Sequence, residues 1–234
     1  MESNLRTERN QAFVLKETDI DKVWNTMQSD VGEVYAEVSF SDSIERKVKT
    51  LGEVLAFENS NKKKITRIGL YARSSSGETI SRVVFEDSKY RPIQVSASGI
   101  DDVVTKFGDN MSEILDGLKP WYSIISKLDF FYVIGFVCWI AYMLLKIMTP
   151  DTPNSNALEL VQSIKIIVIV LSVFGIIALS IWGLNRLQGI YFPFASFAIG
   201  QGLERYRVQE NVRWGVVIAF VVSLAASTVF AVLT

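Results

Sequence analysis

Three stretches in the second half of the chain are uncharged and apolar enough to span a membrane, and they limit the possible folds more than any other feature. They cover residues 130–145, 166–185 and 214–234, which are 16, 20 and 21 residues long. Because an α-helix rises about 1.5 Å per residue, about 20 residues cross the roughly 30 Å hydrocarbon core of a bilayer. The sequence therefore predicts an all-α membrane domain of three transmembrane helices, at about 128–148, 165–185 and 214–234.

Charged side chains are concentrated ahead of these stretches. Residues 1–129 hold 18 Lys and Arg against 21 Asp and Glu, a net charge of −3, whereas residues 130–234 hold six against four. This division predicts a soluble domain over residues 1–119 and the membrane domain over residues 120–234. Pro120 suits the first turn of a helix, so we expect a junction without a flexible linker between the two domains.

Apolar periodicity in the soluble half predicts an α+β domain with an antiparallel sheet and helices. Residues 33–40 alternate apolar and polar side chains, which is typical of a strand, and residues 103–118 carry a helical apolar stripe. Thr50 and Glu53 form a capping-box pattern, and Gly77 can supply the positive φ of a hairpin turn. In chain order we expect a helix at 19–29, strands at 33–40 and 44–50, a short helix to 57, a hairpin over 64–87, a strand at 92–97 and a helix over 101–118.

The distribution of basic residues predicts the membrane topology. Residues 1–10 are polar, with no apolar core typical of a signal peptide. Positively charged loops stay in the cytoplasm, and the loop at residues 186–213 carries four arginines. We therefore expect a multi-pass protein of the cell inner membrane, with a cytoplasmic N-terminus and with residues 149–163 and Thr234 outside.

Small residues recur at every fourth position of the third stretch. Because lipid tails are as apolar as leucine, membrane helices associate where small side chains let their backbones approach closely. This pattern predicts a helix-packing face, whose partner is another helix of this chain or of a second subunit, and it favours a homo-oligomer. The face comprises Gly215, Ala219, Ser223, Ser227 and Ala231.

Residues 187–203 are uncharged but contain Pro193, three glycines and a cluster of aromatic side chains. We interpret residues 190–210 as an interfacial elbow, with a re-entrant segment as the alternative. Aromatic side chains that flank the spans are typical of the headgroup region. The anchors that we expect there are Trp121, Tyr122, Tyr191, Phe192 and Trp214.

One short basic run is a candidate contact for anions or lipid headgroups. It comprises Lys62, Lys63, Lys64 and Arg67. We favour the simpler interpretation that these residues form a solvated turn between strands.

Composition excludes several kinds of chemistry. The chain has no histidine and one cysteine, Cys138, so histidine-based catalysis, zinc clusters and intrachain disulfides are absent. The sequence has neither a phosphate-binding GxxxxGK[ST] motif nor a GxGxxG motif after a strand. We therefore expect no catalytic residues, no metal and no cofactor.

These features together predict a non-enzymatic multi-span membrane protein. Its cytosolic domain would bind a protein or a small-molecule signal, and its membrane domain would contact lipid and self-associate. A near-neutral chain, with a net charge of −1, gives no reason to expect nucleic acid as a partner. The alternatives are a pore-forming or membrane-disrupting effector of a stress or antiviral defence system and, third, a membrane-anchored enzyme.

Overall fold

The computed structural model describes residues 1–148 and 160–233, apart from the side chains of residues 141, 142, 144–148, 160–171, 229 and 231–233. Its elements group into two units. One unit contains Met1–Lys127 together with Tyr191–Thr234, and the other contains Leu128–Ile190. The C-terminal segment, which we assigned to the membrane domain alone, thus also contributes to the unit that holds the sheet.

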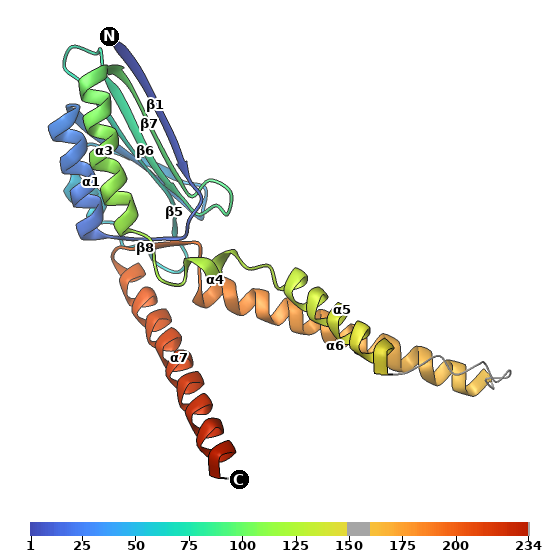
Figure 1. Cartoon of the computed structure of the whole chain (residues 1–234). Helices are drawn as coiled ribbons and strands as arrows, with labels where there is room; N and C mark the ends of the chain where they lie inside the picture. The colour runs from blue at the N-terminus through green and yellow to red at the C-terminus, as the bar shows by residue number, and fades with distance from the viewer. Residues whose placement is uncertain (149–159, 234) are drawn as a thin grey trace. The chain divides into compact units, whose positions relative to one another are not determined.

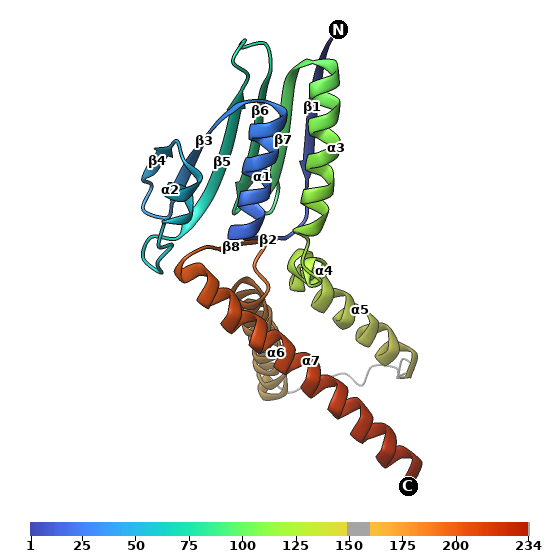
Figure 2. The same ribbon diagram turned by 90° about the vertical axis from the view of Figure 1, so that its left-hand side faces the viewer.

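The first unit is built on a six-stranded antiparallel sheet in the order β1-β7-β6-β5-β3-β4. Helices α1 (Glu17–Asp30) and α3 (Asp101–Gly117) cover one face of this sheet (Figures 1 and 2). Among the described residues of this unit, no helix covers the other face of the sheet (Figures 1 and 2). The prediction of an antiparallel sheet with helices is confirmed. The strands are β1 (Glu2–Arg9), β3 (Glu33–Phe40), β4 (Glu45–Val48), β5 (Ile65–Arg73), β6 (Ile80–Glu86) and β7 (Ile93–Ile100).

Amphipathic helices supply the main core beneath this sheet. Each helix turns the apolar stripe of its 3.6-residue period toward the strands, because burying that stripe is what stabilises a surface helix. Helix α2 (Leu51–Leu55) begins with the expected capping box, in which Thr50 and Glu53 each accept from the other's backbone N–H. The buried side chains of α1 and α3 are Ile20, Val23, Trp24, Met27, Val104, Phe107, Met111 and Leu115.

The first strand was not predicted, because its sequence is polar. β1 pairs with β7 along its whole length, from Glu2 opposite Ile100 to Arg9 opposite Ile93. Its less exposed side chains turn polar groups toward α3: the guanidinium of Arg9 donates to Asp116 Oδ1 and Ser112 Oγ, each at 2.5 Å. Leu5 is the one apolar side chain of this strand and packs against the core, so the strand gives no clear alternating hydrophobic signal.

The interfacial elbow expected over residues 190–210 is replaced by a strand and the start of a long helix. β8 (Ala195–Ala198) pairs in parallel with β2 (Phe13–Lys16), and α7 runs without a break from Gln201 to Leu233. Phe197 and Ile199 lie in the main core, and the Phe13 and Phe197 ring centroids are 5.6 Å apart. In a sequence, a cluster of aromatic side chains is typical of both a headgroup region and a protein core. The strand that pairs with β8 lies about 180 residues upstream, so no local pattern identifies it. Burial in this core also contradicts the re-entrant alternative.

Two helices are long and apolar enough to cross a membrane, judged by length and composition: Ser172–Tyr191, within α6 (Leu160–Tyr191), and Gln201–Thr228, within α7. The predicted first span corresponds to α5 (Phe130–Met148), whose described apolar part, Phe130–Ile140, is shorter than a span. The helix that we expected to begin at Pro120 is the short α4 (Ser123–Lys127), and α5 begins separately after it. The carboxylate of Asp129 accepts from the N–H of Phe131 at 2.9 Å and caps α5. Of the predicted outer segment, residues 149–159 lie outside the described residues, as does Thr234.

Candidate functional site

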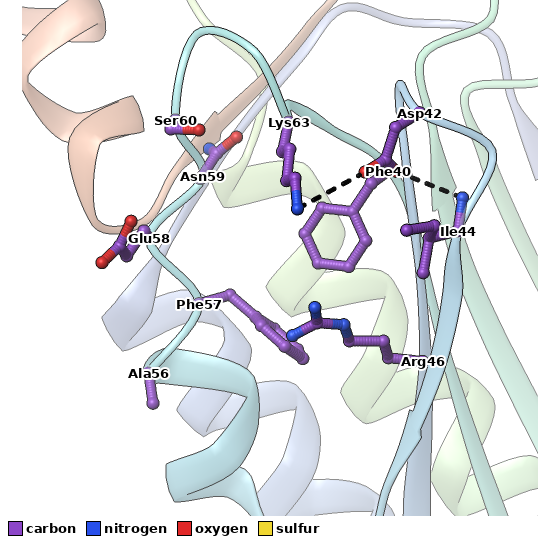
Figure 3. A pocket seen from close by; sticks show the side chains of 10 residues that line it. All are labelled: Phe40, Asp42, Ile44, Arg46, Ala56, Phe57, Glu58, Asn59, Ser60 and Lys63. Carbon is purple, nitrogen blue, oxygen red and sulfur yellow. Dashed lines mark hydrogen bonds and ion pairs between the residues drawn. The ribbon is translucent and has the colours of Figure 1, made fainter.

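The basic run is divided between two surfaces. The lysines are exposed in the turn before β5, and Lys63 lines a cavity of about 320 Å³ between this turn and β4 (Figure 3). Its Nζ atom lies 3.9 Å from Asp42 Oδ2. Phe40 and Phe57 form an aromatic wall, and the Arg46 guanidinium carbon lies 5.7 and 5.8 Å from their ring centroids. The four basic residues therefore do not form a single anion site.

Arg67, the fourth residue of that run, lies on the open face of the sheet, beside a pair of tyrosines. Tyr35 and Tyr71 are opposite each other on β3 and β5, and their rings stack with centroids 5.1 Å apart and 11° between planes. Lys47 Nζ lies 3.9 Å from the Tyr35 centroid, and the Arg82 guanidinium carbon lies 5.5 Å from the Tyr71 centroid. In strand order the four side chains form a cation–tyrosine–tyrosine–cation row, called the open-face row below.

The Tyr71 side chain is held in this row by its neighbours. A Cβ on Gly69 would lie 2.9 Å from Tyr71 Cε2, so only glycine leaves room for the ring to lie across β5. Arg67 Nη2 donates to Tyr71 Oη at 3.3 Å. Burial raises the pKa of the Tyr71 phenol, Arg82 and Arg67 oppose that rise, and Glu37 adds to it. The phenol therefore stays protonated near neutral pH, and the row keeps its charge.

A second cation–tyrosine cluster lies where α7 leaves the sheet domain. Arg213 is 1% exposed, and its guanidinium carbon lies 4.3 Å from the Tyr122 centroid and 5.3 Å from the Tyr206 centroid. Its Nη1 donates to the carbonyl oxygen of Tyr191 at 2.7 Å. Arg213 makes no ion pair with any residue whose side chain the structure describes, so aromatic faces and one carbonyl solvate this buried charge. These residues are called the junction cluster below.

The first turns of α7 are fixed to the domain by a separate polar network. Arg205 donates to the backbone oxygen of Asn59 at 2.7 Å and to its side-chain oxygen at 3.0 Å, while Asn59 Nδ2 donates to Phe197 O at 2.8 Å. Gly200 has φ +50°, and a Cβ there would lie 2.7 Å from the carbonyl oxygens of the Phe57–Glu58 segment. The turn between β8 and α7 is therefore packed against the segment that follows α2.

The predicted membrane-interface anchors fall into two groups. Trp121 and Trp214 are 51% and 50% exposed, with ring centroids 6.0 Å apart. Tyr122 is 1% exposed, which contradicts its assignment as an anchor at the membrane surface, and Phe192 packs against it at 5.8 Å. Tyr191 is half-buried beside Arg213. The aromatic character of these residues is visible in the sequence. That Arg213 contacts Tyr122 and Tyr191 is not.

The predicted helix-packing face is exposed on α7. Gly215, Ala219, Ser223 and Ser227 are all exposed, whereas the side chain of Ala231 lies outside the described residues. Ser223 donates to the Ala219 carbonyl at 2.8 Å and Ser227 to the Ser223 carbonyl at 2.9 Å. These bonds satisfy the hydroxyls within the helix, so the face can contact an apolar partner without leaving a donor unpaired.

Among the residues that the structure describes, no group of three or more acidic or cysteine side chains could hold a metal ion. Cys138 is exposed on α5. A larger cavity, of about 840 Å³, lies on the open face of the sheet and includes both tyrosines of the open-face row. A scan against protein-family models, a search of curated proteins and a search of solved structures each found no match for this chain.

Proposed function

We propose that this chain is a non-enzymatic, multi-span inner-membrane protein that couples binding at a cytosolic domain to self-association of its membrane helices. The observation that carries the proposal is the continuity of α7, a single helix of 33 residues. The helix belongs to the unit that holds the sheet, and its segment Gln201–Thr228 is long and apolar enough to cross a membrane. The uncharged part of the helix starts at Trp214, and this later part is the one that we propose lies in the bilayer.

The change between the two parts of α7 is abrupt. Arg213 is buried, whereas every residue from Trp214 to Thr228 is exposed except Val217, which is partly buried. A helix rises about 1.5 Å per residue and is stiff, so a displacement of the docked turns moves the apolar turns with them. No glycine- or serine-rich linker separates the two parts of α7. The sequence predicted the same for the junction at Pro120, where the soluble domain meets the membrane domain.

Chain connectivity supports the proposed topology. Only three residues separate the end of α6 at Tyr191 from β8, and α7 begins at Gln201, soon after β8. The two candidate spans therefore meet the sheet domain at adjoining ends and would leave it on the same side of the membrane. The arginines near these ends, including Arg186 and Arg207, favour the cytoplasmic side. We propose α5 as the third span, which puts the N-terminus inside and Thr234 outside.

The small-residue face of α7 is the proposed contact for self-association. The native mass of the full-length protein in lipid nanodiscs tests this directly. We expect a discrete oligomer, which the double substitution Ala219→Leu and Ser223→Leu shifts to lower mass because leucine keeps the backbones apart.

The matched control is Val217→Leu with Val221→Leu, which adds leucines at the same spacing about 200° away on the helix. This control should leave the mass unchanged. A wild-type monomer, or equal loss of mass in both double variants, would contradict self-association through this face. Conductance of the same samples in planar bilayers separates coupling without a pore from the pore-forming alternative.

A further inference from the structure

A groove on the open face of the sheet runs along β7. Its floor is formed by small side chains, Ser96 and Ser98, which lie opposite Arg6 and Asn4 of β1 on one side. On the other side they lie opposite Arg82 and Ile80 of β6. Neighbouring strands are about 4.8 Å apart, so Arg6 and Arg82 stand roughly 10 Å apart across Ser96. This spacing leaves room for a phosphate group between two guanidinium groups.

Three arginines supply the positive charge of this groove: Arg6, Arg73 and Arg82. Arg73 and Arg82 are diagonal neighbours, since Arg73 pairs with Ile80 and Tyr71 pairs with Arg82. Neither of these two forms an ion pair with a residue whose side chain is described, and Arg6 pairs only with exposed Glu8, at 3.0 Å. Guanidinium groups bind phosphate oxygens through paired N–H donors, so three arginines at this spacing favour an anion that carries more than one phosphate.

The open-face row holds Arg82 ready for such a ligand. Tyr71 packs against one face of the Arg82 guanidinium, and Tyr35 and Gly69 fix the Tyr71 ring. An arginine that stacks on an aromatic ring keeps its in-plane N–H donors available. Less side-chain entropy is lost on binding when the donor is already oriented.

The groove also offers a surface for a planar ring. Ile80, the first residue of β6, is a large aliphatic side chain that is 52% exposed. Together with the flat guanidinium groups beside it, Ile80 can pack against a base, as arginine planes do in nucleotide recognition. The hydroxyls of Ser96 and Ser98 and the amide of Asn4 can hydrogen-bond a sugar or the edge of a base.

Size and charge limit the ligand to a small molecule. The cavity of about 840 Å³ lies within the usual range for small-molecule sites, about 300–1,000 Å³. Carboxylates flank it on the same face: Glu8 lies opposite Gln94, Glu33 opposite Arg73 and Glu37 opposite Gly69. The phosphates of a long polynucleotide that crossed these rows would be repelled by the carboxylates. A small anion that fits within the groove would avoid them.

We infer that this groove binds a nucleotide carrying two or more phosphates, with the phosphates between Arg6, Arg73 and Arg82 and the base near Ile80. The inference rests on the proposed function for one step only, that this nucleotide is the signal which the domain receives.

The test is isothermal titration of the full-length protein in nanodiscs with adenosine diphosphate, guanosine diphosphate, adenosine, pyrophosphate and a single-stranded RNA of twelve nucleotides. We expect at least one diphosphate to bind at least tenfold more tightly than adenosine or pyrophosphate. Arg82→Gln should weaken that binding about tenfold or more, since it removes a charge-assisted contact. Ser96→Asp should weaken it as well, by placing a negative charge on the floor.

Arg46→Gln is the matched control, because Arg46 also packs on aromatic rings but lines the other cavity. It should leave the affinity unchanged. Equal weakening by Arg46→Gln and Arg82→Gln, tighter binding of RNA than of either diphosphate, or no binding by the folded wild-type protein would overturn the inference. Native mass measured without nucleotide tests self-association separately, so failure of the two proposals can be told apart.

Discussion

The open-face row and the junction cluster use the same side chains in opposite ways. In the junction cluster Arg213 is 1% exposed and is surrounded by Tyr122, Tyr206 and a backbone carbonyl. In the open-face row Arg82 packs on Tyr71 but remains exposed. Burial thus decides the role: a cation enclosed by rings fixes a helix to the domain, whereas a cation with one free face can receive a ligand.

The largest expected difference between the two clusters is in stability. Arg213→Ala removes a fully buried side chain with its ring contacts and its hydrogen bond, and should lower the free energy of unfolding by about 3 kcal/mol. Arg82→Ala lies on an exposed face and should change it by about 0.5 kcal/mol or less. Urea unfolding of the sheet domain in the full-length protein, followed by circular dichroism, measures both. Equal losses would show that the clusters do not differ in role.

A smaller difference should appear at high pH. Burial is the main cause that raises the pKa of Tyr122 to about 12, against the positive charge of Arg213. Because the unfolded phenol ionises near pH 10 and the folded one later, stability is full below pH 10 and falls as pH rises toward 12. The loss should reach about 2–3 kcal/mol. Tyr122→Phe should remove this part of the pH dependence; a variant that loses stability as steeply as wild type would contradict the assignment.

Substitutions that disturb the open-face row should affect binding more than folding. Gly69→Ala places a methyl group against the Tyr71 ring and should weaken diphosphate binding about three- to tenfold. Its cost in unfolding free energy should stay below about 1 kcal/mol, because the ring can move into solvent. Titration and urea unfolding of the same preparation measure the two effects. Unchanged affinity would show that Tyr71 does not position Arg82.

The smallest effect is expected for Tyr122→Phe at neutral pH. The Tyr122 hydroxyl is buried without a hydrogen-bond partner among the described residues. Removing such a group costs little or stabilises, so unfolding free energy should change by less than about 1 kcal/mol. A loss near 3 kcal/mol in the same urea experiment would mean that the hydroxyl has a partner that the structure does not show.

The sequence predicted the part of the fold that depends on local periodicity. The strand at residues 33–40, the hairpin around Gly77 and the helix up to residue 118 all follow from apolar spacing, and Thr50 with Glu53 gave the start of α2. β1 was missed because its inward side chains include Ser3 and Arg9 in place of a continuous apolar set.

The candidate sites depend on pairings that periodicity does not encode. β2 and β8 are about 180 residues apart, and nothing in either segment identifies the other. In the sequence, Tyr122 is likewise typical of an aromatic residue in the headgroup region and Arg213 of a cation in a loop. Only the fold shows that they are in contact. On the open face, Tyr35, Tyr71 and Arg82 each occupy the polar position of an alternating strand, so only the register of β3, β5 and β6 shows that they stack.

Coupling through α7 is tested most directly by changing the phase of the helix at the junction. Two alanines inserted after Arg213 rotate the apolar part by about 200° relative to the domain, whereas four alanines rotate it by about 40°. The measurement is the rate of disulfide formation between subunits carrying Ser223→Cys in a Cys138→Ala background, in nanodiscs, with and without the diphosphate that binds. The proposed coupling predicts that the diphosphate changes this rate in the parent protein and in the four-alanine variant but not in the two-alanine variant. A rate that ignores bound diphosphate in the parent, or responds equally in both insertions, would contradict it.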